Sequence, residues 1–230
     1  MNQILAALAW LAEPENWTGP DGVLTRAGQH IGYSALALVV AAAIAVPLGI
    51  YIGHTGRGRT IAVALSGAVR ALPTLGLLTL LALTMGLGLA WSIVPSTIVL
   101  ALLAIPSLLA ATYSGIDAAD DDVVDGARAT GLSEGQVIGW VELPLAAPIM
   151  FGGLRAAALQ VIATATISAY LGLGGLGRYI LDGLAMNDYP RMLAGAIVVC
   201  TLALVVDGLI LAVQRLLVPL GVRIALGTAR

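Results

Sequence analysis

The sequence has no lysine, one cysteine and two histidines, and charged residues make up only 10% of its 230 residues. Soluble domains carry roughly 25% charged residues, whereas hydrophobic residues make up 59% of this chain. The net charge of −2 is too small to indicate a nucleic-acid partner. Cys200 lies in an apolar run, which predicts a packing role and argues against a disulfide or a thiolate metal site. The composition therefore predicts an integral membrane protein.

The chain also lacks the motifs of familiar enzyme sites. It has no P-loop, no HExxH and no cluster of Cys and His, so we predict no metal site, no cofactor and no ATP chemistry of its own. His30 and His54 lie near opposite ends of one apolar run, which does not suit an intramembrane protease. A secondary transporter would have buried acidic residues, but Asp207 is the sole acid inside a predicted span. We therefore predict that the chain is not an enzyme.

Long runs without charge predict five membrane spans. No Asp, Glu, Lys or Arg occurs between Arg26 and Arg57 or between Arg70 and Asp117, and each run exceeds the about 20 residues that cross a bilayer. Pro73 interrupts the second span, and the backbone groups that it frees need protein or water around them. The chain is thus expected to be all-α, with spans at about 28–53, 60–88, 92–113, 143–171 and 192–217.

The arginines predict the orientation of these spans, because short cytoplasmic loops carry an excess of basic residues. The side that holds the 114–142 segment collects Arg57, Arg59, Arg128, Arg223 and Arg230, and the other side collects Arg26, Arg178 and Arg191. An odd number of spans leaves the two ends on opposite sides. We therefore expect the N-terminus outside and both the C-terminus and the 114–142 segment in the cytoplasm. Residues 1–17 are too short to span, and a helix on the membrane surface is expected there.

The most polar stretch of the chain is expected to fold as two short helices. Acidic residues from Asp120 suit a helix N-terminus, and Gly131 is expected to end that helix. Ser133 and Gln136 have the spacing of a capping box, which starts a second helix that runs to Pro144. A pair of short polar helices joined to a membrane helix is suited to transmit the movement of a soluble partner into the membrane.

The spacing within this stretch resembles the cytoplasmic signature of ABC importer permeases, which runs Glu-Ala-Ala, three residues, Gly, nine residues, Ile, one residue, Leu-Pro. The matching residues here are Asp125, Gly126 and Ala127 for the triplet, Gly131 for the glycine, and Val141, Leu143 and Pro144 for the end. Asp in place of Glu keeps the charge. Gly126 in place of Ala is expected to loosen the first helix by about 1 kcal/mol.

Residues 153–180, together with 72–78 and 47–59, resemble the osmoprotectant subfamily that imports glycine betaine, carnitine or choline. The resemblance implies the type I importer permease fold over 28–218, with a coupling loop at 117–144, an outer segment at 1–27 and a cytoplasmic tail at 219–230. It also implies two cytoplasmic ATPase subunits, a second permease subunit that is a copy or a paralogue, an extracytoplasmic binding protein and a place in the inner membrane. Methionine, other amino acids and sulfonates remain alternative solutes. A secondary transporter remains a less favoured alternative to an ABC importer permease.

The fourth predicted span is rich in small residues, which permit close helix packing in lipid. Gln160, Thr164 and Ser168 are spaced four apart, so a pore wall on one helical face is the alternative to a packed interface. The glycine-rich 172–177 stretch that follows lacks the strand of a nucleotide-binding loop and is expected to be a turn.

Two arginines lie at membrane depth, where charges are costly. For Arg70, beside Pro73, and for Arg155 we favour a structural or gating role over contact with substrate, because a cationic solute would be repelled. Asp207 is a candidate partner for either arginine.

Overall fold

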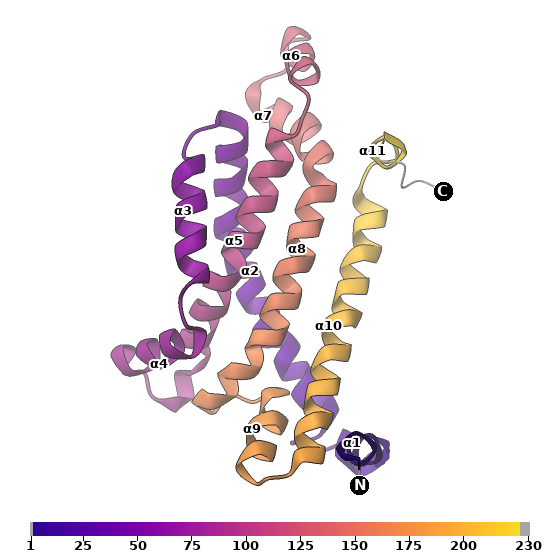
Figure 1. The fold of residues 1–230 in the computed structure, drawn as a ribbon. Helices are drawn as coiled ribbons and strands as arrows, with labels where there is room; N and C mark the ends of the chain where they lie inside the picture. The colour runs from indigo at the N-terminus through magenta and orange to yellow at the C-terminus, as the bar shows by residue number, and fades with distance from the viewer. Residues whose placement is uncertain (1, 226–230) are drawn as a thin grey trace. The chain divides into compact units, whose positions relative to one another are not determined.

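The computed structural model describes residues 2–225, which are mainly helical (Figure 1). The chain divides into two compact units. Unit 1 comprises Met1–Val40, Leu72–Ala104 and Ala158–Val206, and unit 2 comprises Ala41–Ala71, Ile105–Ala157 and Asp207–Arg230. Four long helices contribute residues to both units: α2 (Val23–Thr55), α5 (Ile93–Asp117), α8 (Leu143–Ala165) and α10 (Tyr189–Leu217). The predicted all-α class is confirmed, since the described residues contain no strand.

The predicted spans are found as helices. Four helical stretches are long and apolar enough to cross a membrane: Val23–Thr55, Leu89–Asp117, Glu134–Leu171 and Tyr189–Leu217. Helices α3 (Arg59–Arg70) and α4 (Thr74–Met85) make a fifth, broken span if they are counted together. The break includes Pro73, whose extended backbone cannot continue α3.

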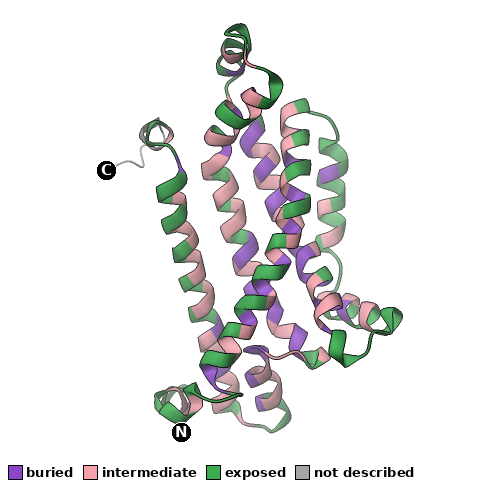
Figure 2. Cartoon of the chain, turned by 180° about the vertical axis from the view of Figure 1, so that it is seen from behind, coloured by how far each residue is buried: buried purple, intermediate pink, exposed green. Residues whose placement is uncertain are grey.

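Unit 1 contains α1 (Gln3–Ala12), α4, α9 (Gly177–Ala185) and the short 3₁₀ turns η1 (Pro14–Trp17), η2 (Leu89–Trp91) and η4 (Thr166–Leu171). Two apolar clusters of buried side chains lie in unit 1, and buried residues are purple in Figure 2. The first cluster consists of Val23, Ile162, Leu176, Tyr179 and Val199, and the second of Leu78, Val99 and Leu103. The helix expected near the N-terminus is present as α1, and its location on a membrane surface stays a prediction.

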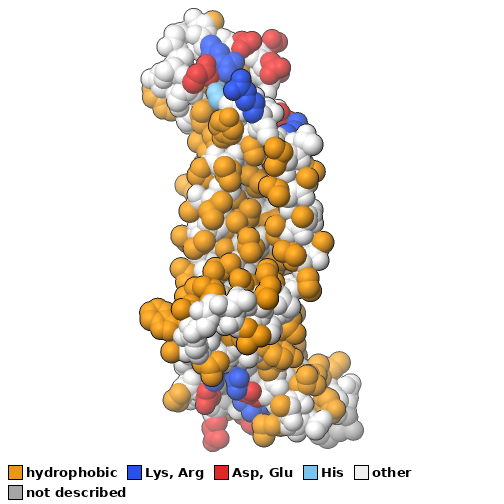
Figure 3. All heavy atoms as spheres, turned by 90° about the vertical axis from the view of Figure 1, so that its left-hand side faces the viewer, with side chains coloured by type: hydrophobic (Ala, Val, Ile, Leu, Met, Phe, Trp, Pro, Cys, Tyr) orange, Lys and Arg blue, Asp and Glu red, His pale blue; other side chains and the backbone are white. Residues whose placement is uncertain are grey.

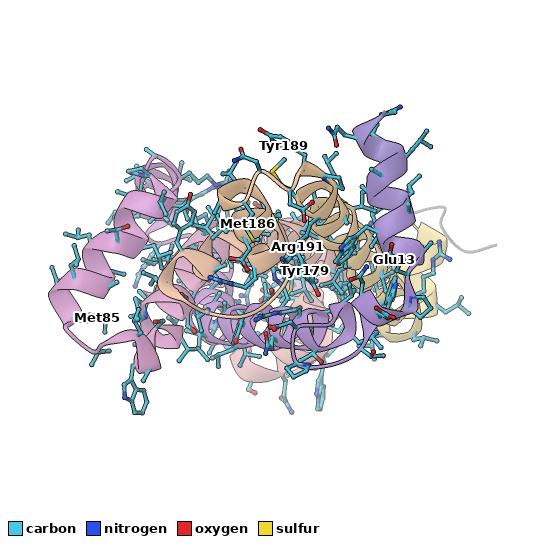
Figure 4. The ribbon with its side chains drawn as sticks, turned by 90° about the horizontal axis from the view of Figure 1, so that it is seen from below. Glu13, Met85, Tyr179, Met186, Tyr189 and Arg191 are labelled. Carbon is cyan, nitrogen blue, oxygen red and sulfur yellow. The ribbon has the colours of Figure 1, made fainter. Side chains whose placement is uncertain are left out.

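Tyr179 organises the part of unit 1 next to α1. Trp10 packs against its ring edge with 5.4 Å between ring centroids, and the Arg191 guanidinium lies 5.6 Å from the ring centroid. Figure 4 shows Tyr179 and Arg191 side by side. The Tyr179 hydroxyl donates to the backbone carbonyl of Asp21, and burial raises the pKa of this hydroxyl, so it remains a donor at neutral pH. These contacts hold the segment before α2 against α9.

Unit 2 contains α3, α6 (Asp121–Ala129), α7 (Glu134–Val137), the π-helical turn η3 (Ile138–Glu142) and α11 (Leu220–Ala225). Glycine lets α2 and α5 approach closely there, because a Cβ on Gly49 would lie 2.6 Å from the Cβ of Thr112. α11 is the described part of the predicted 219–230 tail, whose residues 226–230 lie outside the described range.

We expect Gly49→Ala to destabilise the protein by about 1–3 kcal/mol, because the added methyl group overlaps Thr112 and forces α2 and α5 apart. Gly32→Ala is the matched control in the same helix, since a Cβ at Gly32 meets no heavy atom within 4 Å. The melting temperature of each purified variant in detergent measures the effect. Equal melting temperatures for the two variants would contradict a close helix contact at Gly49.

The outer surfaces of several helices are apolar. α3 exposes Ile61, Val63 and Leu65, and hydrophobic side chains cover much of the visible helical surface in Figure 3. α10 buries only 6% of its most apolar window. Cys200 is a free cysteine exposed on α10, so its predicted packing role does not concern the interior of this chain. Apolar side chains on such a surface can contact the hydrocarbon of the membrane, so they need not be buried inside the protein.

Candidate functional site

The polar stretch predicted as two short helices begins with α6. Asp120 caps its N-terminus by accepting a hydrogen bond from the Asp122 backbone N–H at 2.9 Å, and Asp121 and Asp122 add negative charge in the first turn. Val124 is the buried residue of this helix, while Asp125 and Gly126 are exposed and Ala127 is half-buried. The first part of the predicted signature thus lies on an accessible helix.

Gly131 ends this helix as predicted. Its φ of +92° lies in the left-handed region that favours glycine, and its backbone N–H donates to the Arg128 carbonyl at 2.9 Å. After it, the Gln136 side chain accepts the Ser133 backbone N–H at 2.9 Å, which is the capping-box contact expected from the sequence. The backbone between α6 and α7 therefore has a defined conformation, which Gly131 and the capping box determine.

The second helix of the polar stretch runs without interruption into the membrane span. α7, η3, α8 and η4 form one apolar helical stretch, Glu134–Leu171. Val141 lies in η3, and Leu143 and Pro144 are the first residues of α8. All three are half-buried. α7 and the membrane span are therefore parts of one helical stretch.

Arg128 connects α6 to α7. Its guanidinium donates to both carboxylate oxygens of Glu134, at 3.1 and 3.2 Å, and to Asp125 at 2.9 Å. The hydrogen bond to Glu134, and next that to Asp125, raise the pKa of Arg128, so it stays charged. In unit 2, charged side chains gather around the α6 and α7 end, in contrast to the apolar helical surface beside it (Figure 3).

His54 and Glu142 also belong to this region, and the sequence analysis did not include them in the site. His54 Nδ1 lies 2.9 Å from Glu142, and His54 Nε2 lies 3.1 Å from Glu134. In the sequence, His54 stands out only as a histidine at the end of a predicted span, and Glu142 only as an acid between Val141 and Leu143. Neither signal identifies the other as its partner.

The structure separates the three residues predicted to share one helical face. Gln160 and Thr164 lie one turn apart on α8 and are half-buried. Ser168 lies in the 3₁₀ turn η4 and is 2% exposed. α8 ends at Ala165, and the tighter winding of the 3₁₀ turn places Ser168 outside the regular α-helical spacing. That the three residues line a pore stays a prediction. The following 172–177 segment is a turn as predicted, with positive φ at Gly172 and Gly175.

Arg155 has Asp207 as its partner. Its guanidinium donates from Nε and from Nη2 to the two Asp207 carboxylate oxygens, each at 2.7 Å, which joins α8 to α10 within unit 2. Arg70 is the last residue of α3, and its guanidinium lies 3.5 Å from the Ser107 hydroxyl, at the outer limit of a hydrogen bond. The candidate partnership of Asp207 is thus settled in favour of Arg155. A bidentate pair compensates both charges at membrane depth.

Two solved structures that resemble this chain are ABC transporters. One is an inward-facing conformation of the MetNI methionine ABC transporter, with a TM-score of 0.74 and 17% identity over 90% of this chain and 100% of that chain. Another is an amino acid ABC transporter, with a TM-score of 0.62 and 16% identity over 93% of this chain and 96% of that chain. At this identity the likeness establishes the fold, which is the predicted type I importer permease fold.

The relatives by sequence are osmoprotectant permeases. Choline transport system permease protein OpuBB of Bacillus subtilis is 29% identical, over 90% of this chain and 93% of its own length. Osmoprotectant import permease protein OsmW of Salmonella typhimurium is 33% identical, over 85% and 91%. Carnitine transport permease protein OpuCD of Listeria monocytogenes is 34% identical, over 88% and 89%.

A family model described as the inner membrane component of binding-protein-dependent transport systems matches residues 45–218. This match includes the whole of the α6-to-α8 region and the Arg155–Asp207 pair. The chain therefore belongs to that family of inner-membrane components and is a permease subunit of an ABC importer.

Proposed function

We propose that the chain forms half of the translocation path for an osmoprotectant such as glycine betaine, choline or carnitine. The observation that carries this proposal is the similarity to choline, carnitine and osmoprotectant permeases over nearly the full length of both chains. The second half of the path is a copy of this chain or a paralogue. ATP hydrolysis is assigned to two partner ATPase subunits, and solute capture to an extracytoplasmic binding protein.

The coupling role is assigned to the 117–144 loop. We propose that the ATPase subunits hold α6 and the turn around Gly131, and that Val141, Leu143 and Pro144 carry their motion into α8. Three features support this assignment. Asp125 and Gly126 are exposed, Arg128 joins α6 to α7, and α7 continues into the span without a break. A binding surface that is rigidly connected to a membrane helix is the element that such coupling needs.

The remaining predicted residues have roles in the membrane. We propose that Gln160 and Thr164 offer weak hydrogen bonds along the path, as half-buried polar groups on one turn of α8. Ser168 is buried in η4, so its proposed contact with the path requires movement of this turn. Arg70 and Pro73 are assigned a gating or structural role at the break between α3 and α4, and the N-terminus is assigned to the outside.

Uptake of labelled glycine betaine tests the substrate class. We expect cells that lack other betaine systems to lose uptake at low external concentration when this gene is deleted. Choline and carnitine are expected to compete, because they share the quaternary ammonium group, whereas methionine is not. Unchanged uptake would reject the osmoprotectant assignment. Competition by methionine alone would favour an amino-acid permease, which is the alternative that the structural likeness to the methionine transporter supports.

A further inference from the structure

His54, at the end of α2, lies between two carboxylates of the coupling region. Its Nδ1 is 2.9 Å from both carboxylate oxygens of Glu142, and its Nε2 is 3.1 Å from Glu134 Oε2. Glu142 belongs to the π-helical turn η3 and Glu134 to α7. The imidazole therefore connects α2 to both parts of the helical stretch that leads into α8.

Glu142 is unusually deep for an acid. Its side chain is 5% exposed, compared with 59% for Glu134, whereas the neighbouring Trp140 is 67% exposed. Both Glu142 and Trp140 lie in the π-helical turn, and such a turn rotates the side chains that follow it relative to a regular α-helix. A buried carboxylate without a partner is strongly destabilising. The burial of Glu142 therefore depends on a hydrogen-bond donor, and the His54 ring lies in position to provide it.

A charged ring satisfies both contacts. Neutral imidazole has one N–H donor and one lone pair, and a carboxylate is only an acceptor. If both ring nitrogens of His54 are to donate, to Glu142 on one side and to Glu134 on the other, the ring must carry two protons. The charged groups on the elements around this end of α2 are Glu134 of α7, Glu142 of η3 and, behind Glu134, Arg128 of α6. α5 also packs there, and its last residue, Asp117, forms an ion pair with Arg59 of α3.

The contacts continue from His54 to the exposed face of α6. Glu134 accepts from Arg128, and Arg128 also donates to Asp125 of the predicted signature triplet. The side chains of Arg128, Glu134 and His54 thus join Asp125 to the end of α2. A movement of α6 is thereby transmitted to α2 as well as to α8.

We propose that His54, as an imidazolium bridging Glu134 and Glu142, is the positioning residue that ties the coupling segment to α2, so that transport requires its protonation. This proposal rests on the proposed coupling role of residues 117–144. It predicts that transport weakens as pH rises, because the ring loses its second proton and one of the two bridges.

The experiment uses the complete importer, with its ATPase and binding protein, in proteoliposomes at equal pH on both sides. Solute uptake and ATP hydrolysis are measured in parallel between about pH 5 and about pH 8, the interval in which histidine side chains change charge. For the unmodified importer we expect uptake per ATP to fall by about fivefold or more over this range.

Two variants distinguish the bridge from simple packing. His54→Gln has no charged ring, so we expect low uptake per ATP at every pH. Glu142→Gln provides an amide that donates to a neutral ring, so we expect transport to persist at high pH with a flat profile. Glu15→Gln, an exposed acid in unit 1, is the control that should keep the original profile.

A profile for His54→Gln equal to that of the unmodified protein would overturn the proposal. So would an unchanged pH dependence in Glu142→Gln, which carries the test if His54→Gln does not assemble. If the unmodified importer takes up no betaine, the substrate assignment fails, but the pH profile of its ATP hydrolysis still tests His54.

Discussion

Gly131→Pro is expected to abolish solute uptake while the permease still inserts and assembles. Proline fixes φ near −65° and has no backbone N–H, whereas Gly131 has φ +92° and donates to the Arg128 carbonyl. The substitution therefore redirects the chain between α6 and α7, in an exposed turn away from the packed helices. Uptake in cells and the amount of permease in the membrane fraction are the two measurements.

Gly131→Asn is the matched variant for this prediction. Asparagine adopts the left-handed region more readily than other residues that carry a side chain, and a Cβ at this position meets no heavy atom within 4 Å. We expect Gly131→Asn to retain a substantial part of uptake. Normal uptake by a well-expressed Gly131→Pro variant would refute a coupling role for this turn, and equal loss in both variants would refute the dependence on backbone geometry.

Arg155→Gln is expected to lower the yield of folded permease by about tenfold or more, because it leaves Asp207 charged and without its bidentate partner in the membrane. The pair has two contacts of 2.7 Å between α8 and α10. The yield of monodisperse protein in detergent and its melting temperature report this effect. Asp207→Asn is expected to act in the same direction, because it leaves the arginine as the isolated charge.

The double variant Arg155→Leu with Asp207→Leu removes both charges, and we expect it to recover much of the lost yield. Arg178→Gln is the control, since it breaks another 2.7 Å pair, with Asp182, that lies outside the spans. Its effect is expected to be small, as for ion pairs in water. A double variant no better than either single variant would show that the pair has a role beyond charge compensation, such as gating.

The sequence predicted the spans well because hydrocarbon tolerates few charges. The charge-free run that ends at Arg57 corresponds to α2, and the run that begins after Arg70 contains α4 and α5. Pro73 lies at the break between α3 and α4. The local structure of the polar 117–144 loop was equally accessible to sequence reasoning. Its start, its left-handed glycine and its capping box depend on residues at most a few positions apart, and local backbone geometry follows from such neighbours.

The partners of the buried charges were decided by the tertiary structure alone. The sequence left Asp207 equally available to Arg70 and Arg155, and it gave no sign that His54 contacts Glu142, 88 positions away. It also assigned Ser168 to an α-helical face that ends at Ala165. Periodicity predicts which residues share a face within one regular helix, but which helices meet, and at what height, depends on packing among all of them. The sequence thus determined where the spans and the two short polar helices lie, and the packing decided which charges met.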